Sequence, residues 1–242
     1  MFPLTPEYYS HWLLLGYRSI SSAAYCQSPN HVVVTARNPS SLSTIPDRDN
    51  VLKLALDVTS IASIEAALSY TLVGDTKIAE DGVTSMGGFI GYPGSAFYHA
   101  SKFAMDGWTE AVAKELHVEW NIHLCNIEPS GVKTNYANTS LKTRAQGRHP
   151  AYADPSHPTN TLLGYMSKEE NRSSWTEPDA IAAAMYRLVS RGQWIPIRLP
   201  LGADAYGMIC MALESIKKDM DEFRDISLGV GEAKHLDSIG FL

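Results

Sequence analysis

Glycine is scarce at the start of this chain, and cysteine is scarce throughout it. Gly16 is the sole glycine before Gly74. The three cysteines, Cys26, Cys125 and Cys210, are dispersed and show no metal-ligand spacing. This pattern argues against a disulfide framework and a zinc finger, and it favours a reducing compartment, the cytoplasm.

Long hydrophobic runs and an excess of positive charge are also missing. The longest apolar run near the start, Trp12 to Gly16, is too short for a signal peptide or a membrane helix. A net charge of −6 and a pI near 5.7 argue against a nucleic-acid partner or an anionic membrane surface. With 242 residues, 45% of them hydrophobic, the chain fits one globular domain with a sizeable core.

The most informative stretch runs from Thr84 to Thr134 and centres on Tyr98 and Lys102. Their spacing of four residues places both side chains on one face of a helix. A phenol alone titrates at about pH 10 and transfers protons poorly at neutrality, whereas a neighbouring ammonium favours the phenolate. Ser85 lies thirteen residues before Tyr98, and its hydroxyl could orient a substrate carbonyl toward the tyrosine proton.

A helix and a buried strand are expected after Tyr98. Phe103, Trp108, Val112 and Leu116 recur at near-helical spacing and predict an apolar helix face. The run from Asn121 to Ile127 predicts a strand that ends before Pro129, Ser130 and Gly131. Upstream, His31 to Asn38 predicts a buried strand and a loop, Val51 to Val58 a second strand, and Ile61 to Leu68 a short helix.

These motifs occur in one order and closely resemble the C-terminal half of the short-chain dehydrogenase/reductase family. The matching features are Ser85-Met-Gly-Gly, Gly91-Tyr-Pro-Gly, Tyr98-x-x-x-Lys102 and Pro129-x-x-x-x-Thr134. The resemblance covers Ser85 to about Leu201, and it implies an α/β doubly wound parallel sheet of the Rossmann-like type. It also implies Ser85, Tyr98 and Lys102 as catalytic residues. The alternative is an amphipathic helix that carries an exposed Tyr–Lys pair.

The resemblance also implies residues that contact a dinucleotide. Gly16 stands where the family has its glycine fingerprint, although it could equally be a plain turn, because two of the three glycines are missing. Arg37 follows the strand whose end meets the ribose in this family. An arginine at this position resembles NADP-preferring members. The alternative is a solvated surface arginine. Asp57 resembles the residue that contacts the adenine. Tyr98 and Lys102 would also contact the cofactor.

The loop from Pro129 through Val132 to Thr134 resembles the family's loop beside the nicotinamide, although Ser130 stands where the family usually has glycine. The polar, proline-containing stretch of residues 135–175 predicts a mobile substrate lid. Further on, the sequence predicts a helix over residues 180–191 with Thr176 as N-cap and Gly192 as C-cap, an edge strand over residues 194–199, and a last helix over residues 203–224.

The middle of the chain is shorter than the family pattern. Only 28 residues separate Asp57 from Ser85, and that interval contains no asparagine. The family's Asn-Asn-Ala-Gly strand and the long helix after it have no counterpart here, a loss of roughly fifty residues. We therefore expect a damaged sheet centre, with two half-sheets and unpaired backbone groups, and no complete Asn–Ser–Tyr–Lys tetrad.

Together these observations predict a single domain with a degenerate cofactor-binding half, residues 1–84, and a catalytic half, residues 85–242. The expected activity is NADP(H)-dependent interconversion of a ketone and a secondary alcohol. The TARNP run after Val34 and the LGADAYGM run from Leu201 resemble hydroxysteroid and retinol dehydrogenases, which suggests a small lipophilic substrate. The alternatives are an inactive pseudoenzyme and a non-catalytic partner subunit. A homo-oligomer through Lys102 to Trp120 is expected to be weakened by the deletion.

Overall fold

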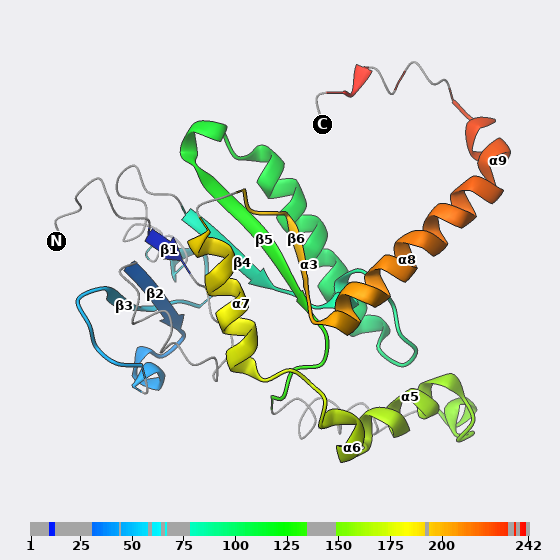
Figure 1. The fold of residues 1–242 in the computed structure, drawn as a ribbon, viewed down its shortest axis with the longest axis horizontal. Coiled ribbons are helices and arrows are strands. Elements are labelled where there is room, and N and C mark those ends of the chain that lie inside the picture. The colour runs from blue at the N-terminus through cyan, green and yellow to red at the C-terminus, as the bar shows by residue number, and fades with distance from the viewer. Residues whose placement is uncertain are drawn as a thin grey trace.

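The computed structural model describes residues 10–12, 31–43, 45–57, 60–63, 66, 78–134, 149–191, 194–231, 235 and 238–240. Within them, six strands form one parallel sheet in the order β3-β2-β1-β4-β5-β6 (Figure 1). The strands are β1 (Ser10–Trp12), β2 (His31–Ala36), β3 (Val51–Ala55), β4 (Ile78–Val83), β5 (Ile122–Pro129) and β6 (Arg198–Leu201). This arrangement confirms the doubly wound Rossmann-like fold.

Most helices of the described residues lie in the C-terminal half, after β4. The α-helices are α3 (Ala96–Glu115), α5 (Pro158–Ser167), α6 (Glu169–Arg172), α7 (Pro178–Ser190), α8 (Ala203–Glu222) and α9 (Arg224–Leu228). Short 3-10 helices are η1 (Pro39–Leu42), η2 (Met86–Gly88), η3 (Val118–Trp120) and η5 (Pro150–Tyr152). None of these helices is long and apolar enough to cross a membrane.

The centre of the sheet is continuous, so the expectation of two separate half-sheets is wrong. β1 pairs with β2 at three positions, from Ser10↔His31 to Trp12↔Val33. On its other side β1 pairs directly with β4, at Trp12↔Glu80. Both edges of β1 are therefore paired, and the chain closes the sheet without a further strand between β1 and β4. The pairing of β1 with β4 is short compared with the six-position pairing of β4 and β5.

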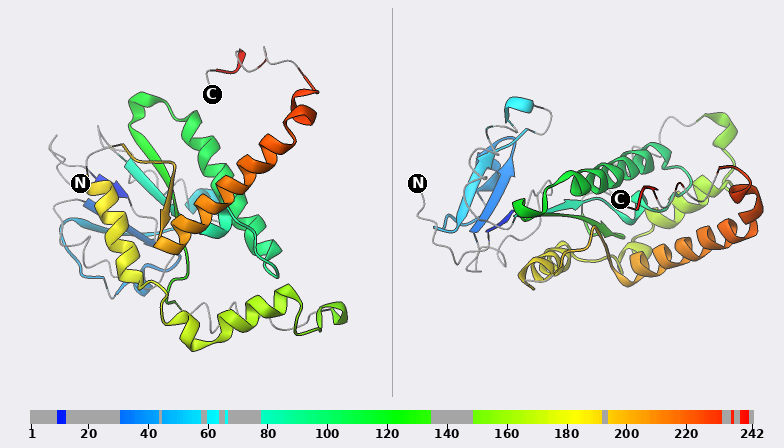
Figure 2. Two further views of the ribbon diagram at one scale, coloured as in Figure 1. Left: turned by 45° about the vertical axis from the view of Figure 1, so that its right-hand side comes forward. Right: turned by 90° about the horizontal axis from the view of Figure 1, so that it is seen from above.

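α3 and α7 cover opposite faces of the sheet (Figure 2). The alternation of side chains along β5 fits this arrangement, because successive residues of a strand point to opposite faces. Cys125 and Ile127 belong to the apolar cluster built around α7. Asn126 points the other way, and its amide donates to the backbone oxygen of Asp106 in α3.

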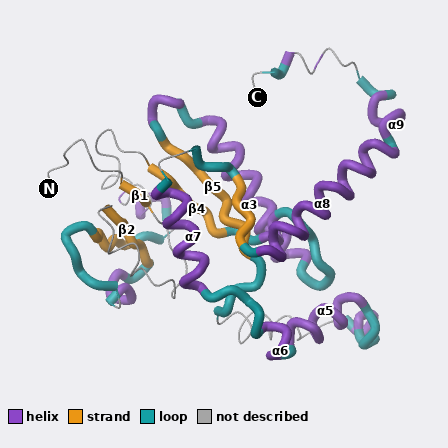
Figure 3. The backbone as a smooth tube through the Cα atoms, in the orientation of Figure 1, coloured by secondary structure: helices purple, strands orange, loops and turns teal. Residues whose placement is uncertain are grey.

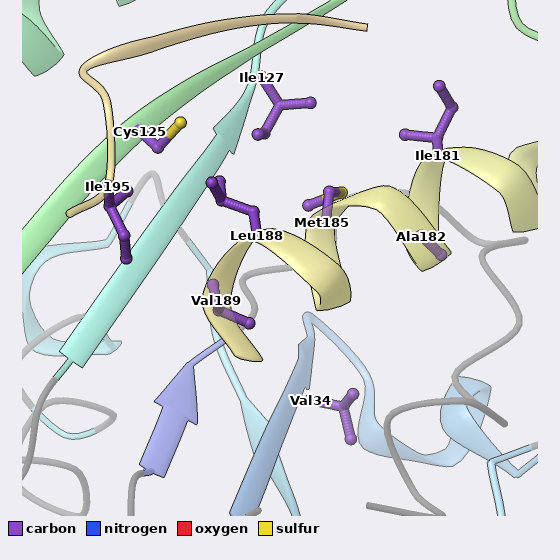
Figure 4. Packing of buried hydrophobic residues seen from close by; sticks show 9 residues of the cluster. All are labelled: Val34, Cys125, Ile127, Ile181, Ala182, Met185, Leu188, Val189 and Ile195. Carbon is purple, nitrogen blue, oxygen red and sulfur yellow. The ribbon is translucent and has the colours of Figure 1, made fainter. Parts of the chain in front are cut away.

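The apolar core lies between α7 and the sheet (Figure 4). Its buried members are Val34, Cys125, Ile127, Ile181, Ala182, Met185, Leu188, Val189 and Ile195. Five of them recur along α7, so one face of this helix is fully apolar. The cluster joins β2 to β5 across the sheet, because Val34 comes from β2 and Ile127 from β5.

The sheet-facing side of α3 is polar, contrary to the expected apolar face. Its buried residues are His99, Asp106 and Thr109. Phe103 is 46% exposed and Trp108 is 63% exposed. The periodicity of apolar residues thus identified the helix but not its buried side, because the sheet presents Asn126 and Glu128 to α3 instead of an apolar surface.

Several predicted boundaries shift in the structure. Glu177, not Thr176, is the N-cap of α7, and Arg191 is its C-cap, while Gly192 lies outside the described residues. The last strand is Arg198–Leu201, later in the chain than the expected residues 194–199, and it lies at the sheet edge as expected. The described part of the predicted lid contains α5 and α6. α8 runs away from the sheet (Figures 1 and 3). Only Ala205 and Ile209 of this helix are buried.

Candidate active site

The predicted catalytic residues lie at one edge of the sheet. Because all the strands are parallel, their carboxyl ends meet at the same edge, where ligands of open α/β sheets bind. The strand order reverses between β1 and β4, which is the topological switch point of this sheet. Ser85 follows β4 by two residues, so it borders this point.

Ser85 is held by the short helix η2 that it caps. Its Oγ accepts a hydrogen bond from the backbone N–H of Gly87 at 3.0 Å, and its carbonyl oxygen accepts from Gly88 at 2.8 Å. Both glycines are buried, so this turn packs tightly below the serine. A hydroxyl that accepts from an amide can still donate its own proton, which is the role that carbonyl orientation needs.

Tyr98 lies directly against this turn. A Cβ atom added to Gly87 would come within 3.0 Å of Tyr98 Cε1. The absence of a side chain at residue 87 therefore permits the close approach of the serine turn and the tyrosine ring. The structure thus places Tyr98 against the turn that Ser85 caps, although thirteen residues separate Tyr98 from Ser85 in sequence.

Lys102 lies one helical turn beyond Tyr98 and reaches the end of β4. Its Nζ donates to the carbonyl oxygen of Val83 at 3.4 Å. Burial lowers the pKa of Lys102, and the nearby carboxylate of Asp106 opposes that effect. The ammonium is therefore partly desolvated at the end of β4, so all three predicted catalytic residues lie around this strand end and the turn that follows it.

A buried ionic cluster below Lys102 was missed at the sequence level. Arg198 Nη1 lies 3.0 Å from Asp106 Oδ2 and 2.8 Å from Glu128 Oε1, and both acids are almost fully buried. Burial is the main cause that raises the pKa of Glu128, and the hydrogen bond from Arg198 opposes it. The available signals were Glu128 inside an apolar strand and Asp106 four residues after Lys102.

For His99 the sequence suggests only a structural or surface role, because the histidines show no metal-ligand spacing. It is buried, its Nδ1 contacts Gly87 in the serine turn, and its Nε2 accepts from the backbone N–H of Tyr92 beyond that turn. The signal was its position directly after Tyr98, which places it on the neighbouring, sheet-facing side of the helix. Among the described residues, no group of histidine, cysteine and acidic side chains could hold a metal ion.

The predicted nicotinamide loop begins where β5 ends. Pro129 is buried, and Val132 forms a parallel bridge with Thr176. Ser130 donates its backbone N–H to Leu201 at 3.3 Å, so the loop is fixed to the end of β6. Thr134 is half-buried at the last described position of this segment. The loop therefore begins at the same carboxyl edge as Ser85.

The three remaining cofactor residues fall in the N-terminal half. Arg37 directly follows β2, and its side chain is exposed at the carboxyl edge. Asp57 is half-buried two residues after β3, and its backbone N–H donates to Ser63 Oγ at 2.9 Å. Gly16 lies outside the described residues. The structure thus places Arg37 and Asp57 on neighbouring strands, apart from the loop that follows β5.

Comparisons with known proteins agree with this geometry. The model of the short chain dehydrogenase family matches residues 82–145. The oxidoreductase calM of Penicillium decumbens is 34% identical over 87% of this chain and 88% of its own length. That alignment spans 269 positions, more than the 242 residues present here, so calM contains residues without a counterpart in this chain.

Solved structures show the same fold. A short-chain dehydrogenase from Streptomyces avermitilis has a TM-score of 0.67 at 21% identity, covering 94% of this chain and 100% of that one. A short chain dehydrogenase from Burkholderia cenocepacia, solved in complex with NADP, has a TM-score of 0.59 at 13% identity, covering 88% and 97% of the two chains. On the strength of the calM alignment, the shared fold and the grouped Ser85, Tyr98 and Lys102, the chain belongs to the short-chain dehydrogenase/reductase family.

Proposed function

We propose that this chain is an NADP(H)-dependent oxidoreductase that interconverts a lipophilic ketone and a secondary alcohol. The observation that carries the proposal is the grouping of Ser85, Tyr98 and Lys102 at the carboxyl edge of the sheet. The Gly87–Tyr98 contact and the hydrogen bond from Lys102 to Val83 define that grouping.

The side chains present fit a dinucleotide. The ammonium of Lys102 offers donors to the ribose hydroxyls near the end of β4, and the nearby carboxylate of Asp106 favours its charged form. Arg37 offers an exposed cation at the end of β2, where a 2′-phosphate would lie in this fold. Solved structures of this fold contain NADH as well as NADP, so the preference for NADPH rests on Arg37.

Each catalytic residue has a separate task in ketone reduction. Ser85 donates its hydroxyl proton in a hydrogen bond to the substrate carbonyl oxygen, which polarises the C=O bond. The carbonyl carbon accepts a hydride, which NADPH would supply when bound. Tyr98 transfers its phenolic proton to the carbonyl oxygen, and Lys102 stabilises the phenolate that remains. The products are the secondary alcohol and the oxidised cofactor, and oxidation of an alcohol follows the reverse path.

A lipophilic substrate is proposed from the two sequence runs that resemble hydroxysteroid and retinol dehydrogenases. Residues 135–175 are proposed as the segment that covers this substrate. The cytoplasm is the proposed location, because Cys125 and Cys210 are free thiols that a reducing compartment would preserve. We propose a single domain with a shortened cofactor-binding half, residues 1–84, and an intact catalytic half, residues 85–242.

The scarcity of glycine before Gly74 favours a second candidate, a family member without turnover. It would keep Ser85, Tyr98 and Lys102 but would lack the glycine-rich turn that lets a backbone approach the pyrophosphate. The lack of an asparagine between Asp57 and Ser85 points the same way.

Thermal melting with and without NADPH separates the two candidates. A ligand at a hundredfold excess over its Kd stabilises the native state by about 2.7 kcal/mol. For a chain of this size that raises the Tm by roughly 5–10 °C. A melt that does not respond to millimolar NADPH would support the second candidate.

Turnover is then tested with 1-decalone as a lipophilic probe ketone. Loss of NADPH absorbance should require the Tyr98 hydroxyl, so Tyr98→Phe should lower kcat by about 10²–10⁴-fold. The NADPH-induced melting shift should persist in this variant, because the tyrosine ring is retained. Full activity in Tyr98→Phe would remove Tyr98 from the proposed mechanism.

A further inference from the structure

His99 connects the catalytic helix to two backbone positions that follow Ser85, Gly87 and Tyr92. The residue is only 6% exposed and lies directly after Tyr98 in α3. Its Nδ1 lies 2.8 Å from the carbonyl oxygen of Gly87. Its Nε2 accepts a hydrogen bond from the backbone N–H of Tyr92 at 2.9 Å. One buried side chain thus holds two backbone groups that lie five residues apart.

These partners determine the protonation state of the ring. A carbonyl oxygen can only accept, so Nδ1 must bear the proton that points to Gly87. A backbone N–H can only donate, so Nε2 must keep its lone pair for Tyr92. The ring is therefore neutral, with the proton on Nδ1. An imidazolium, which donates through both nitrogens, would leave the N–H of Tyr92 without this acceptor.

The hydrogen bond to Gly87 leads directly to the catalytic serine. The carbonyl oxygen of Gly87 accepts from His99, while the N–H of the same residue donates to Ser85 Oγ at 3.0 Å. Both polar groups of Gly87 are thus engaged, one by the helix and one by the serine. A shift of the imidazole would move Gly87 and, with it, the hydroxyl that faces the substrate carbonyl.

Contacts with two aromatic rings also hold the imidazole of His99 in place. The centroid of His99 lies 5.5 Å from that of Tyr98, with the planes at 74°, and 5.3 Å from that of Tyr92, with the planes at 59°. Tilted and edge-to-face rings at this separation attract each other. The catalytic tyrosine therefore packs against the same imidazole that holds the serine turn.

We propose that His99 is a positioning residue that sets the place of Ser85 relative to Tyr98 during carbonyl reduction. The inference rests on the proposed function, and it adds a residue to the site that the sequence motifs do not include. His99 does not touch the reacting atoms in this scheme. Its effect passes through Gly87 to Ser85 on one side and through ring contact to Tyr98 on the other.

Two matched variants separate the two hydrogen bonds. In His99→Asn the side-chain amide lies at the distance of Nδ1 and can still donate to Gly87, but it does not reach Tyr92. In His99→Phe the ring volume is kept and both hydrogen bonds are lost. We expect kcat with 1-decalone to fall by about 10²-fold in His99→Phe, in line with the effect of small displacements in active sites, and by less in His99→Asn. The Kd for NADPH should stay within about threefold of the original value, which a general loss of folding would not allow.

A double-mutant cycle with Ser85→Ala tests the route of the effect. If His99 acts through Ser85, adding His99→Phe to Ser85→Ala should lower kcat by less than about threefold further. Losses in kcat that multiply in full would overturn the proposal, because His99 would then act independently of the serine. Equal losses in His99→Asn and His99→Phe would overturn the assigned role of the Gly87 contact.

Nitrogen NMR of the histidine rings keeps the inference testable if the chain proves inactive. The original chain should show His99 as a neutral ring protonated on Nδ1, and His99→Phe should shift the amide signals of Gly87 and Tyr92 but not those of α7. A ring protonated on Nε2, or a rapid mixture of tautomers, would overturn the inference whatever the activity. Failure to bind NADPH combined with the expected ring spectrum would instead reject the proposed function and leave the positioning contact in place.

Discussion

Arg198 of β6 and Asp106 of α3 form an ion pair of 3.0 Å that ties the edge strand to the catalytic helix. The same guanidinium nitrogen lies 2.8 Å from Glu128 of β5. Three elements thus meet at one cation below Lys102. Since both carboxylates are buried, they depend on Arg198 far more than an exposed acid would depend on its partner.

Replacement of Arg198 by methionine should therefore destabilise the chain strongly. The variant leaves Asp106 and Glu128 buried without their shared cation, which typically costs about 3–5 kcal/mol of the free energy of unfolding. Urea denaturation measures the change. Lys217→Met is the control, because Lys217 forms an exposed pair with Asp221 and should leave the urea midpoint unchanged. Equal midpoints for the two variants would show that the buried cluster contributes little.

The dependence of stability on pH should reveal Glu128. Burial raises the pKa of this carboxyl above its ordinary value of 4.5. A group with a higher pKa in the folded state contributes most stability below its unfolded pKa, and the contribution is lost as the pH rises through the folded pKa. Glu128→Gln removes this titration, so the stability of the variant relative to the original chain should be greater at pH 7 than at pH 4.5. Urea denaturation at the two pH values measures this difference, and a trend of opposite sign would contradict the assignment.

Two glycines should respond in opposite ways to substitution by alanine. A Cβ atom on Gly88 would overlap the carboxylate of Asp106, which is itself fixed by Arg198. Gly88→Ala should therefore destabilise by about 1–3 kcal/mol, as overpacking does. Gly107 lies in α3 with open space at its Cβ position, so Gly107→Ala should stabilise by about 0.5–1 kcal/mol. Thermal melts of the two variants should shift in opposite directions, and shifts of one sign would contradict the packing around η2.

Arg37 should decide between the two nicotinamide cofactors. Loss of an exposed guanidinium that faces a phosphate weakens binding of NADPH but removes nothing from NADH. Arg37→Ala should therefore raise the Kd for NADPH about tenfold, equivalent to about 1.4 kcal/mol, and change the Kd for NADH by less than about threefold. Titration calorimetry with both cofactors gives the ratio, with exposed Arg224→Ala as the control. An equal change for NADPH and NADH would return Arg37 to the role of a solvated surface residue.

The catalytic half could be predicted because its signals are local. The four-residue spacing of Tyr98 and Lys102, the apolar strand before Pro129 and the buried glycines after Ser85 each lie within a few turns of chain. The predicted order of a helix and then a buried strand, α3 and β5, is confirmed by the structure.

The polar interior of α3 could not be predicted in the same way. Asp106 meets Arg198 across 92 residues of sequence, so nothing near either residue shows the pairing. An apolar periodicity predicts a helix, but it does not show which side of that helix faces a polar strand. The expected buried face therefore includes Phe103 and Trp108, although both are exposed. The closed sheet centre likewise depends on β1 meeting β4, a pairing between distant segments.

Because β1 pairs with β4 at one position, the packing under α7 also holds the two parts of the sheet together. Backbone pairing across the middle of the sheet passes through Ser10–Trp12, whereas the apolar cluster under α7 joins Val34 of β2 to Ile127 of β5. Hydrophobic packing weakens on cooling, while hydrogen bonds do not lose strength in the same way. On cooling, the two parts of the sheet should therefore separate first. The temperature of cold denaturation would then depend on the apolar packing of α7 more than on the pairing of the strands.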